Sequence, residues 1–225
     1  MFAATTNPLL DGTGGTWDAL IEAVAPASLL VVIESRMSRE LRRLHTPEDI
    51  LQEALLHAWR DRTRFEWRGL KSFRSWLLTL IDNRIREAAD RSAALKRGGG
   101  REAIAISTLA GGTASESGSA AGAAWPARST TPSRVAVFRE QAAGMRTALA
   151  ELPADVRDVV RLRLFEQLSI GDIAARLGLG ESAVRHRFRQ GAEMYHRRLR
   201  AALASRASLP SESAPLVEPN SSPVE

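Results

Sequence analysis

Residues 46–86 read TPEDILQEALLHAWRDRTRFEWRGLKSFRSWLLTLIDNRIR, and they open with a helix start signal. Thr46 suits the N-cap, Pro47 the first helical position, and Asp49 stands three residues after the cap. Apolar residues then recur at helical spacing and form one apolar face: Ile50, Leu51, Ala54, Leu55, Ala58 and Trp59. This pattern predicts an amphipathic helix that begins at Pro47.

The opposite face of this helix is polar and carries Asp49, Gln52, Glu53 and Arg60, with Leu56 among them. A single exposed leucine usually has no function. Beside two carboxylates four residues apart, however, Leu56 resembles the centre of a docking surface, whose core is apolar and whose rim is polar. The simpler alternative is an ordinary solvated helix side.

A basic and aromatic loop follows at residues 64–71, and after it a second apolar helix with Phe73, Trp76, Leu77, Leu80 and Ile81. Basic residues interleaved with Phe65 and Trp67 can hold a nucleic-acid backbone and stack an unpaired base. The amide of Asn83 can both donate and accept at a base edge. The alternative for Asn83 is a polar residue that caps or bridges helices. We expect Phe73, Trp76 and Leu77 to be core.

Composition favours a helical protein with a polyanionic partner. Of the 225 residues, 44% are hydrophobic and only 5% aromatic, and the net charge is +5. A basic balance suits nucleic acid, although it also occurs in proteins that bind none. The chain has no cysteine, no secretory signal pattern at its start, and no apolar run longer than residues 29–33. We therefore expect a cytoplasmic protein without membrane insertion.

The periodicity predicts an all-α fold of two small helical domains joined by a flexible linker. Residues 1–15 are expected to be disordered. Residues 16–91 form the first unit, in which Pro26 starts a helix with apolar positions through Leu44. Residues 92–133 are rich in Gly, Ala and Ser and are predicted to be a tether, and residues 134–204 form the second unit. The tail at residues 205–225 is again expected to be disordered.

The second unit contains helix-turn-helix spacing. Ser169 and Asp172 form a capping box for a short helix through Leu177. The turn at residues 178–180, Gly-Leu-Gly, uses glycine's freedom at positive φ. A longer helix is predicted from about Glu181 to Ala202, with Val184, Phe188, Ala192, Tyr195 and Leu199 on its inner face.

The outward arc near the start of this longer helix holds Ser182, Arg185, His186 and Arg189. This part of a recognition helix enters the major groove, where arginine hydrogen-bonds bidentately to guanine. Arg187, Arg197, Arg198 and Arg200 suit phosphates, which position the protein without specifying sequence. The alternative is a solvated basic face on an ordinary helical pair.

No catalytic set or cofactor motif emerges. The serines lack a plausible His and Asp pairing, and no phosphate-binding glycine motif follows a strand. Asp49, Glu53 and His57 stand four residues apart in turn, which allows a metal site, but the four histidines show no paired spacing. We expect no enzyme activity, no metal and no cofactor.

Two stretches carry a family resemblance. EDILQEALLHAWR…F…SFRSWLLTLIDN, from residue 48 to residue 83, resembles the core-binding and promoter-melting region of bacterial sigma factors of the extracytoplasmic-function type. ALAELPADVRDVVRLRLFEQLSIGDIAARLGLGESAVRHRFRQG, residues 148–191, resembles the region of the same family that reads the minus-thirty-five element. Both stand in the family's order, joined by the family's kind of variable linker. The resemblance covers about two-thirds of the chain.

The resemblance implies a promoter-specificity subunit whose partners are core RNA polymerase and promoter DNA, and it leaves open an anti-sigma factor. Asp49, Gln52 and Glu53 match the motif that docks on the polymerase clamp helices, and Leu56 completes our candidate docking surface. Asn83 matches a position that helps select a flipped minus-ten base. The candidate minus-ten residues are Arg64, Phe65, Arg68, Lys71, Asn83 and Arg86, and the upstream-element residues are Ser182, Ala183, Arg185, His186 and Arg189.

Two departures limit this transfer. His186 and Arg189 stand at positions where relatives vary, so the resemblance does not tell which promoter sequence this chain recognises. Asp82 places an acid beside Asn83 and the proposed DNA face. Two other functions stay open: a conventional helix-turn-helix repressor or activator that uses residues 16–91 for dimerisation or effector binding, and an RNA-binding helical protein of the antitermination type.

Overall fold

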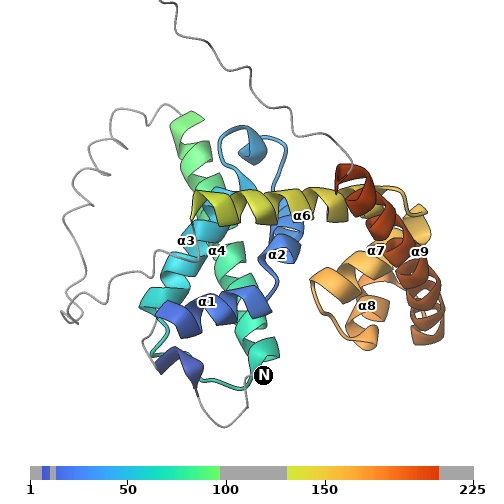
Figure 1. The fold of residues 1–225 in the computed structure, drawn as a ribbon, viewed down its shortest axis with the longest axis horizontal. Coiled ribbons are helices and arrows are strands. Elements are labelled where there is room, and N and C mark those ends of the chain that lie inside the picture. The colour runs from blue at the N-terminus through green and yellow to red at the C-terminus, as the bar shows by residue number, and fades with distance from the viewer. Residues whose placement is uncertain (1–6, 11–13, 97–130, 208–225) are drawn as a thin grey trace, which may run out of the picture.

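The structure, a computed structural model, describes residues 7–10, 14–96 and 131–207, and every regular element in these ranges is helical. The predicted all-α fold class is confirmed. The helices form two groups, and α6 crosses from one to the other (Figure 1).

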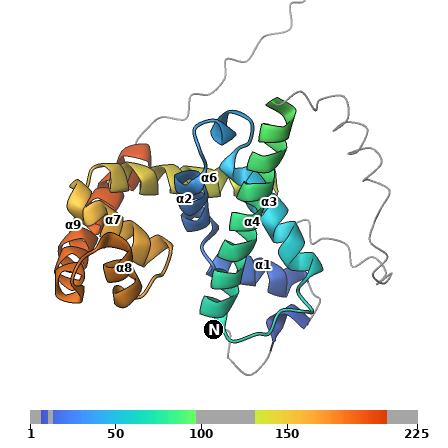
Figure 2. The same cartoon turned by 180° about the vertical axis from the view of Figure 1, so that it is seen from behind.

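The first unit is built around one buried helix. Its elements are η1 (Pro8–Leu10), α1 (Gly14–Ala23), α2 (Pro26–Arg36), η2 (Leu41–Arg43), α3 (Pro47–Arg60) and α4 (Leu70–Lys96). Residues 26–33 of α2 are all buried. A helix that is apolar all round needs neighbours on every side, and α2 has them in α3, α4 and α6 (Figures 1 and 2).

α2 is shorter than the sequence pattern predicts. It ends at Arg36 because Met37 is extended, whereas we expected helix through Leu44. The hydroxyl of Ser38 accepts a hydrogen bond from the backbone N–H of Leu41 at 3.1 Å, which favours a separate 3-10 turn over continued helix. Met37 and Leu41 still reach the core, and Leu44 is 59% exposed.

Several element boundaries differ from the predicted segments. η1 lies within the first 15 residues, where we expected disorder, because Leu9 is buried in the core. α4 continues past residue 91 to Lys96, and α6 begins at Pro132. Residues 97–130, most of the predicted tether, and residues 208–225, most of the predicted tail, lie outside the described residues. The tether and the disordered tail stay predictions.

The second unit begins with α6. Its elements are α6 (Pro132–Ala150), α7 (Ala154–Val160), the π-helical turn η3 (Arg161–Phe165), α8 (Ile170–Leu177) and α9 (Glu181–Ala207). A small core under the helix-turn-helix contains Val159, Leu162, Ile173, Ala174 and Val184. Farther along α9, Tyr195 packs edge-on against Phe165 at 5.8 Å between ring centroids and joins the larger core.

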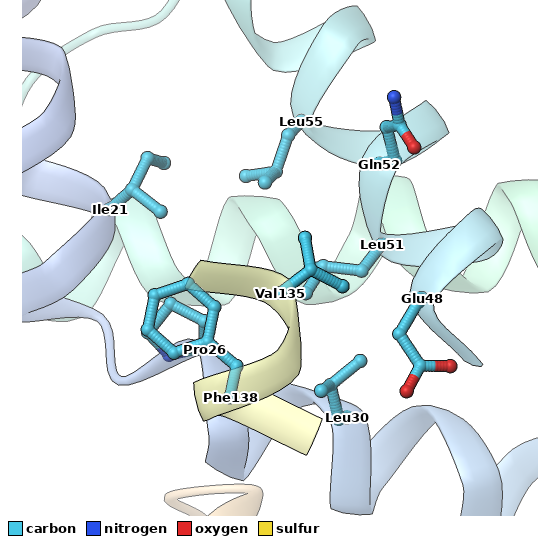
Figure 3. A pocket seen from close by; sticks show the side chains of 9 residues that line it. All are labelled: Ile21, Pro26, Leu30, Glu48, Leu51, Gln52, Leu55, Val135 and Phe138. Atoms are coloured by element: carbon cyan, nitrogen blue, oxygen red, sulfur yellow. The ribbon is translucent and has the colours of Figure 1, made fainter. Parts of the chain in front are cut away.

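The two units share a core, because α6 packs against α2. On α6, Val137 is 50% exposed, and Phe138 packs inward, into a groove between α1, α2 and α3 (Figure 3). Phe138, Ala142 and Met145 are spaced three or four residues apart and therefore share the face of α6 that packs on the core. Val137 lies outside this face. Arginines of α6 also pair with acids of the first unit: Arg134 with Glu22, Arg139 with Glu48 at 2.8 Å, and Arg146 with Glu34 at 2.6 Å.

A polar seam runs between the units. The buried carboxylate of Glu166 accepts hydrogen bonds from Arg36 at 2.8 Å, Arg161 at 2.5 Å and Arg176 at 3.4 Å. Arg36 also pairs with Asp82 of α4 at 2.7 Å. Because a buried carboxylate is stable only when it is paired, Glu166 depends on Arg36 of the first unit as well as on its own unit.

Arg74 of α4 is a second link in this seam. Its buried guanidinium donates to the carbonyl oxygen of Val24, to the Ser28 hydroxyl at 2.9 Å, and to the carbonyl oxygen of Phe165 at 2.7 Å. Burial lowers the pKa of Arg74 to about 10, so the group stays charged at neutral pH. Among the described residues no carboxylate pairs with it.

No single described helix is long and apolar enough to cross a membrane. α1 and α2 pass that test only together, across a bend of 60°.

The crossing of α7 and α9 generates a stability prediction. A Cβ on Gly191 would lie 2.5 Å from Val160 Cγ2 and 3.1 Å from Val156 Cβ. Gly191→Ala should therefore lower the free energy of unfolding by about 1–3 kcal/mol, as overpacking does. Gly171→Ala is the matched control, because its Cβ would meet nothing closer than 3.5 Å, and it should leave stability unchanged or raise it slightly. Urea denaturation measures both variants, and equal stability would contradict the close packing.

Candidate functional site

The polar face of α3 combines a helix cap with exposed polar groups. The Thr46 hydroxyl accepts from the Asp49 N–H at 3.2 Å, and the Asp49 carboxylate accepts from the Thr46 N–H at 3.0 Å, so the predicted capping box is present. The hydrogen bond from the Thr46 N–H to the carboxylate, and then the Thr46 side chain, lower the pKa of Asp49. Gln52 is exposed, and Glu53 and Leu56 are half-buried. Glu53 lies 3.7 Å from Arg91 of α4.

His57 is not placed as a metal ligand. Arg84 Nη1 lies 3.1 Å from its Nε2, and a guanidinium can only donate, so Nε2 accepts and the ring is neutral. Burial, and then the charge of Arg84, lower the pKa of His57. No group of three or more potential metal ligands occurs among the described residues.

The loop before α4 is packed by aromatic contacts. Phe65 stacks on Trp76 at 4.6 Å and 20°, and it meets Phe73 edge-on at 5.9 Å. Trp67 packs against the same group. Phe73 is fully buried as expected, whereas Trp76 is only half-buried. Phe65 therefore contributes to the core as well as to the surface.

Two adjoining surface hollows open beside this aromatic group. One is lined by Asp61, Arg64, Phe65, Glu66, Arg68, Ser72 and Trp76, and the next adds Lys71, Ser75 and Thr79. Aromatic edges, hydroxyls and cations thus meet at one place, which suits a base and its phosphate. Arg68 is held by Glu66 at 2.8 Å in an exposed pair, so it can exchange that partner at little cost.

Asn83 lies half-buried on α4, and its Oδ1 accepts from Arg86 Nη1 at 3.1 Å. This hydrogen bond is thus within one helix, between residues i and i+3, and it leaves the amide N–H groups of Asn83 for another acceptor. Asp82 is turned to Arg36, which neutralises the acid that stands beside Asn83 in the sequence.

The helix-turn-helix is built as its local signals predict. The Ser169 hydroxyl accepts from the Asp172 N–H at 3.1 Å, and the Asp172 carboxylate accepts from the Ser169 N–H at 3.2 Å. Gly178 has φ of +65° and ends α8 in the left-handed region, where glycine has no Cβ penalty; Gly180 does not share this conformation.

The candidate upstream-element residues at the start of α9 are all exposed: Ser182, Ala183, Arg185, His186 and Arg189. Val184, between them, is fully buried and holds this end of α9 on its core. Arg185 pairs with Glu181 at 2.5 Å, one turn earlier and in solvent. Contact with a base would have to replace that pair.

Sequence reasoning missed the residues that join the two units. The chief ones are Phe138, Glu166 and Arg74, each of which contacts residues far away in the chain. Arg36 is followed by three more arginines within residues 39–43, but this spacing carries no signal for its partner Glu166, 130 positions later.

Protein-family comparisons agree with this geometry. A family model described as Sigma-70 region 2 matches residues 28–94, and one described as Sigma-70, region 4 matches residues 143–193. Together they span just over half of the chain. The first match contains the α3 and α4 surfaces, and the second contains α8 and the candidate residues at the start of α9. Among curated proteins no match was found.

The environment of His57 generates a pH prediction. The pKa of His57 is lower in the folded chain than in the unfolded chain, so between the two values only the unfolded chain takes up the proton. Stability should therefore fall as pH drops through about 6.5 and be unaffected above it. His57→Gln should remove this part of the pH dependence. Urea unfolding of both proteins at about pH 7.5 and about pH 5.5 checks it; identical pH dependence in the variant would contradict it.

Proposed function

Because this chain belongs to the sigma-70 family of promoter-recognising factors, as a member of the extracytoplasmic-function type, we propose that it binds core RNA polymerase, recognises a promoter and assists strand opening. Its site of action is then the cytoplasm, with the polymerase. The observation that carries the proposal is the presence, in one chain and in order, of both family regions with their candidate contact residues on the surface.

The polar face of α3 supports polymerase binding. Asp49 and Glu53 present negative charge on the two turns before Leu56, Arg60 follows one turn after it, and Gln52 is exposed beside the acids. The lowered pKa of Asp49 keeps that carboxylate ionised well below neutral pH. An apolar centre with a charged rim is the usual composition of a transient docking surface.

The hollows beside Phe65 and Trp76 support capture of the opened strand. Arg64, Arg68 and Lys71 surround them, and Asn83 and Arg86 follow on α4. Cations hold the backbone, aromatic edges receive an unstacked base, and the Asn83 amide supplies hydrogen bonds to a base edge.

The exposed arc of α9 supports duplex recognition. Its residues follow the short helix α8 and its turn, and they lie in the first three turns of α9, the part that enters the major groove. Family membership favours this function over the two alternatives left open by the sequence, because neither a conventional helix-turn-helix repressor or activator nor an RNA-binding protein of the antitermination type needs both sigma-70 regions in one chain.

The direct test is run-off transcription with core polymerase and genomic DNA. The proposal expects discrete transcripts that depend on this chain. Their absence, with a core preparation that responds to another sigma factor, would contradict the proposed function.

Charge reversal on α3 should abolish polymerase binding. We choose Glu53→Arg because Asp49 also caps α3, and its replacement would confound binding with folding. Glu193→Arg, an exposed acid on α9, makes the same charge change in the other unit and is the matched control. At physiological salt, the Glu53→Arg variant should no longer co-purify with core polymerase, and the Glu193→Arg variant should still do so. Equal retention of both would show that this face does not dock.

Promoter opening and upstream recognition should separate by mutation. Arg185→Ala should cost about 1–3 kcal/mol of discrimination at one base pair, because a bidentate base contact is lost. It should leave opening intact on a template that is already mismatched at minus ten. Asn83→Ala should bind duplex promoter nearly normally and open it poorly.

Gel shift on duplex promoter and permanganate footprinting of opened thymines measure the two steps separately. Arg200→Ala removes an exposed candidate phosphate contact and is the control for loss of an arginine charge on α9. It should weaken binding to all promoter sequences alike. If Asn83→Ala opens promoters as the parent does, the amide is structural.

A further inference from the structure

Three arginines of the first unit stand close together without an acidic partner. We call residues 38–44, between α2 and α3, the η2 turn; its charged residues are Arg39, Glu40, Arg42 and Arg43. The three arginines are exposed, and no acid in the described ranges pairs with them. Other exposed arginines of this unit are neutralised: Arg64 by Asp61 at 3.8 Å, Arg68 by Glu66 at 2.8 Å and Arg91 by Glu53 at 3.7 Å. The η2 turn therefore leaves positive charge for an anionic partner.

The backbone of the η2 turn is fixed by its own hydrogen bonds and by one core residue. Leu41, in its middle, is buried. The Ser38 hydroxyl accepts from the Leu41 N–H. The N–H groups of Arg42 and Arg43 donate to the carbonyl oxygens of Ser38 and Glu40, each at 3.1 Å. Because this backbone is ordered before a partner arrives, binding costs less conformational entropy than it would on a flexible loop.

The η2 turn lies beside the C-terminal half of α4 (Figures 1 and 2). Leu41, Arg43 and Leu44 of the turn line a hollow together with Ala89, Ser92 and Ala93 of α4. Arg86, Ala89 and Ala93 are spaced three or four residues apart, so they share one face of α4. Arg86, a proposed minus-ten residue, therefore lies on the side of α4 that meets the turn, about one helical turn earlier.

This position continues the proposed path of the promoter. The hollows for the opened strand lie around Phe65 and Trp76, at the N-terminal half of α4. Asn83 and Arg86 come next along the helix, and the η2 turn comes last. From Asn83 to Ala93 the helix rises about 15 Å, the length of about four base pairs of B-DNA. Because the second unit reads the upstream element, the duplex that continues past α4 toward that element is the spacer between the two elements.

We propose that Arg39, Arg42 and Arg43 form a phosphate-binding turn, which holds the backbone of the spacer duplex directly upstream of the minus-ten element. This inference rests on the proposed function and adds to it a contact outside both recognised elements. Guanidinium groups bind phosphate oxygens through charge-assisted hydrogen bonds. Phosphate contacts position a protein without reading sequence, so the turn should contribute affinity to every promoter alike.

The salt dependence of promoter binding tests this contact. Holoenzyme is assembled from core polymerase and the full chain, and its affinity for promoters found by run-off transcription is measured between about 50 and 200 mM salt. Each phosphate contact contributes about 0.9 to the slope of log affinity against log salt. Arg39→Gln with Arg42→Gln and Arg43→Gln should therefore reduce the slope by about 2–3, and by the same amount on different promoters.

Two controls separate charge from folding and locate the contact. Lysine at the same three positions keeps the charge and also binds phosphate, so this variant should keep a slope close to that of the parent chain. A fork template without duplex upstream of the minus-ten element lacks the spacer, and on it the glutamine variant should bind as the parent does. Circular dichroism checks that both variants keep the helical content of the parent.

Three results would contradict the phosphate-binding turn. One is an equal salt slope for the glutamine variant and the parent on the complete promoter. Another is an equal loss of affinity on the fork template, which would place the contact outside the spacer. The third is weaker binding of the variant to core polymerase without DNA, which would show that the turn meets an acidic surface of the polymerase. If the parent itself forms no holoenzyme or yields no transcript, the proposed function fails, and this inference fails with it.

Discussion

The burial of α2 on every side is the constraint on which the rest of the structure depends. Residues 26–33 present apolar side chains all round the helix, and burying a Leu, Val or Ile side chain stabilises a fold by about 1.5–3 kcal/mol. One layer of helices cannot supply that cover. α3 and α4 supply part of it and α6 another part, which is why a helix from the second half of the chain belongs to the first core.

This constraint also explains where the functional surfaces lie. α3 and α4 turn their apolar faces to α2, so the opposite faces carry the exposed and half-buried groups proposed for polymerase and for the opened strand. At the seam, Arg74 and Glu166 are buried polar groups whose partners come from both units. Such groups cost desolvation that hydrogen bonds only offset, so they fix one arrangement of the units more than they strengthen it.

The sequence predicted those parts of the fold whose signals are local. Both capping boxes, the positive φ at Gly178 and the extent of α8 follow from a few adjacent residues and are present. It did not predict the end of α2, where the Ser38 hydroxyl competes with helix, or the inward turn of Phe138, whose groove is built from distant residues. For the candidate site, type and spacing indicated the exposed residues, but not that Phe65 also packs in the core.

Hydrogen–deuterium exchange of the full chain tests the central claim most directly: α6 supplies part of the cover that α2 needs. The account predicts that Phe138→Ala speeds exchange of the α2 amides and that Val137→Ala does not, because Phe138 packs against the core and Val137 is exposed. Equal exchange of the α2 amides in the two variants would contradict it.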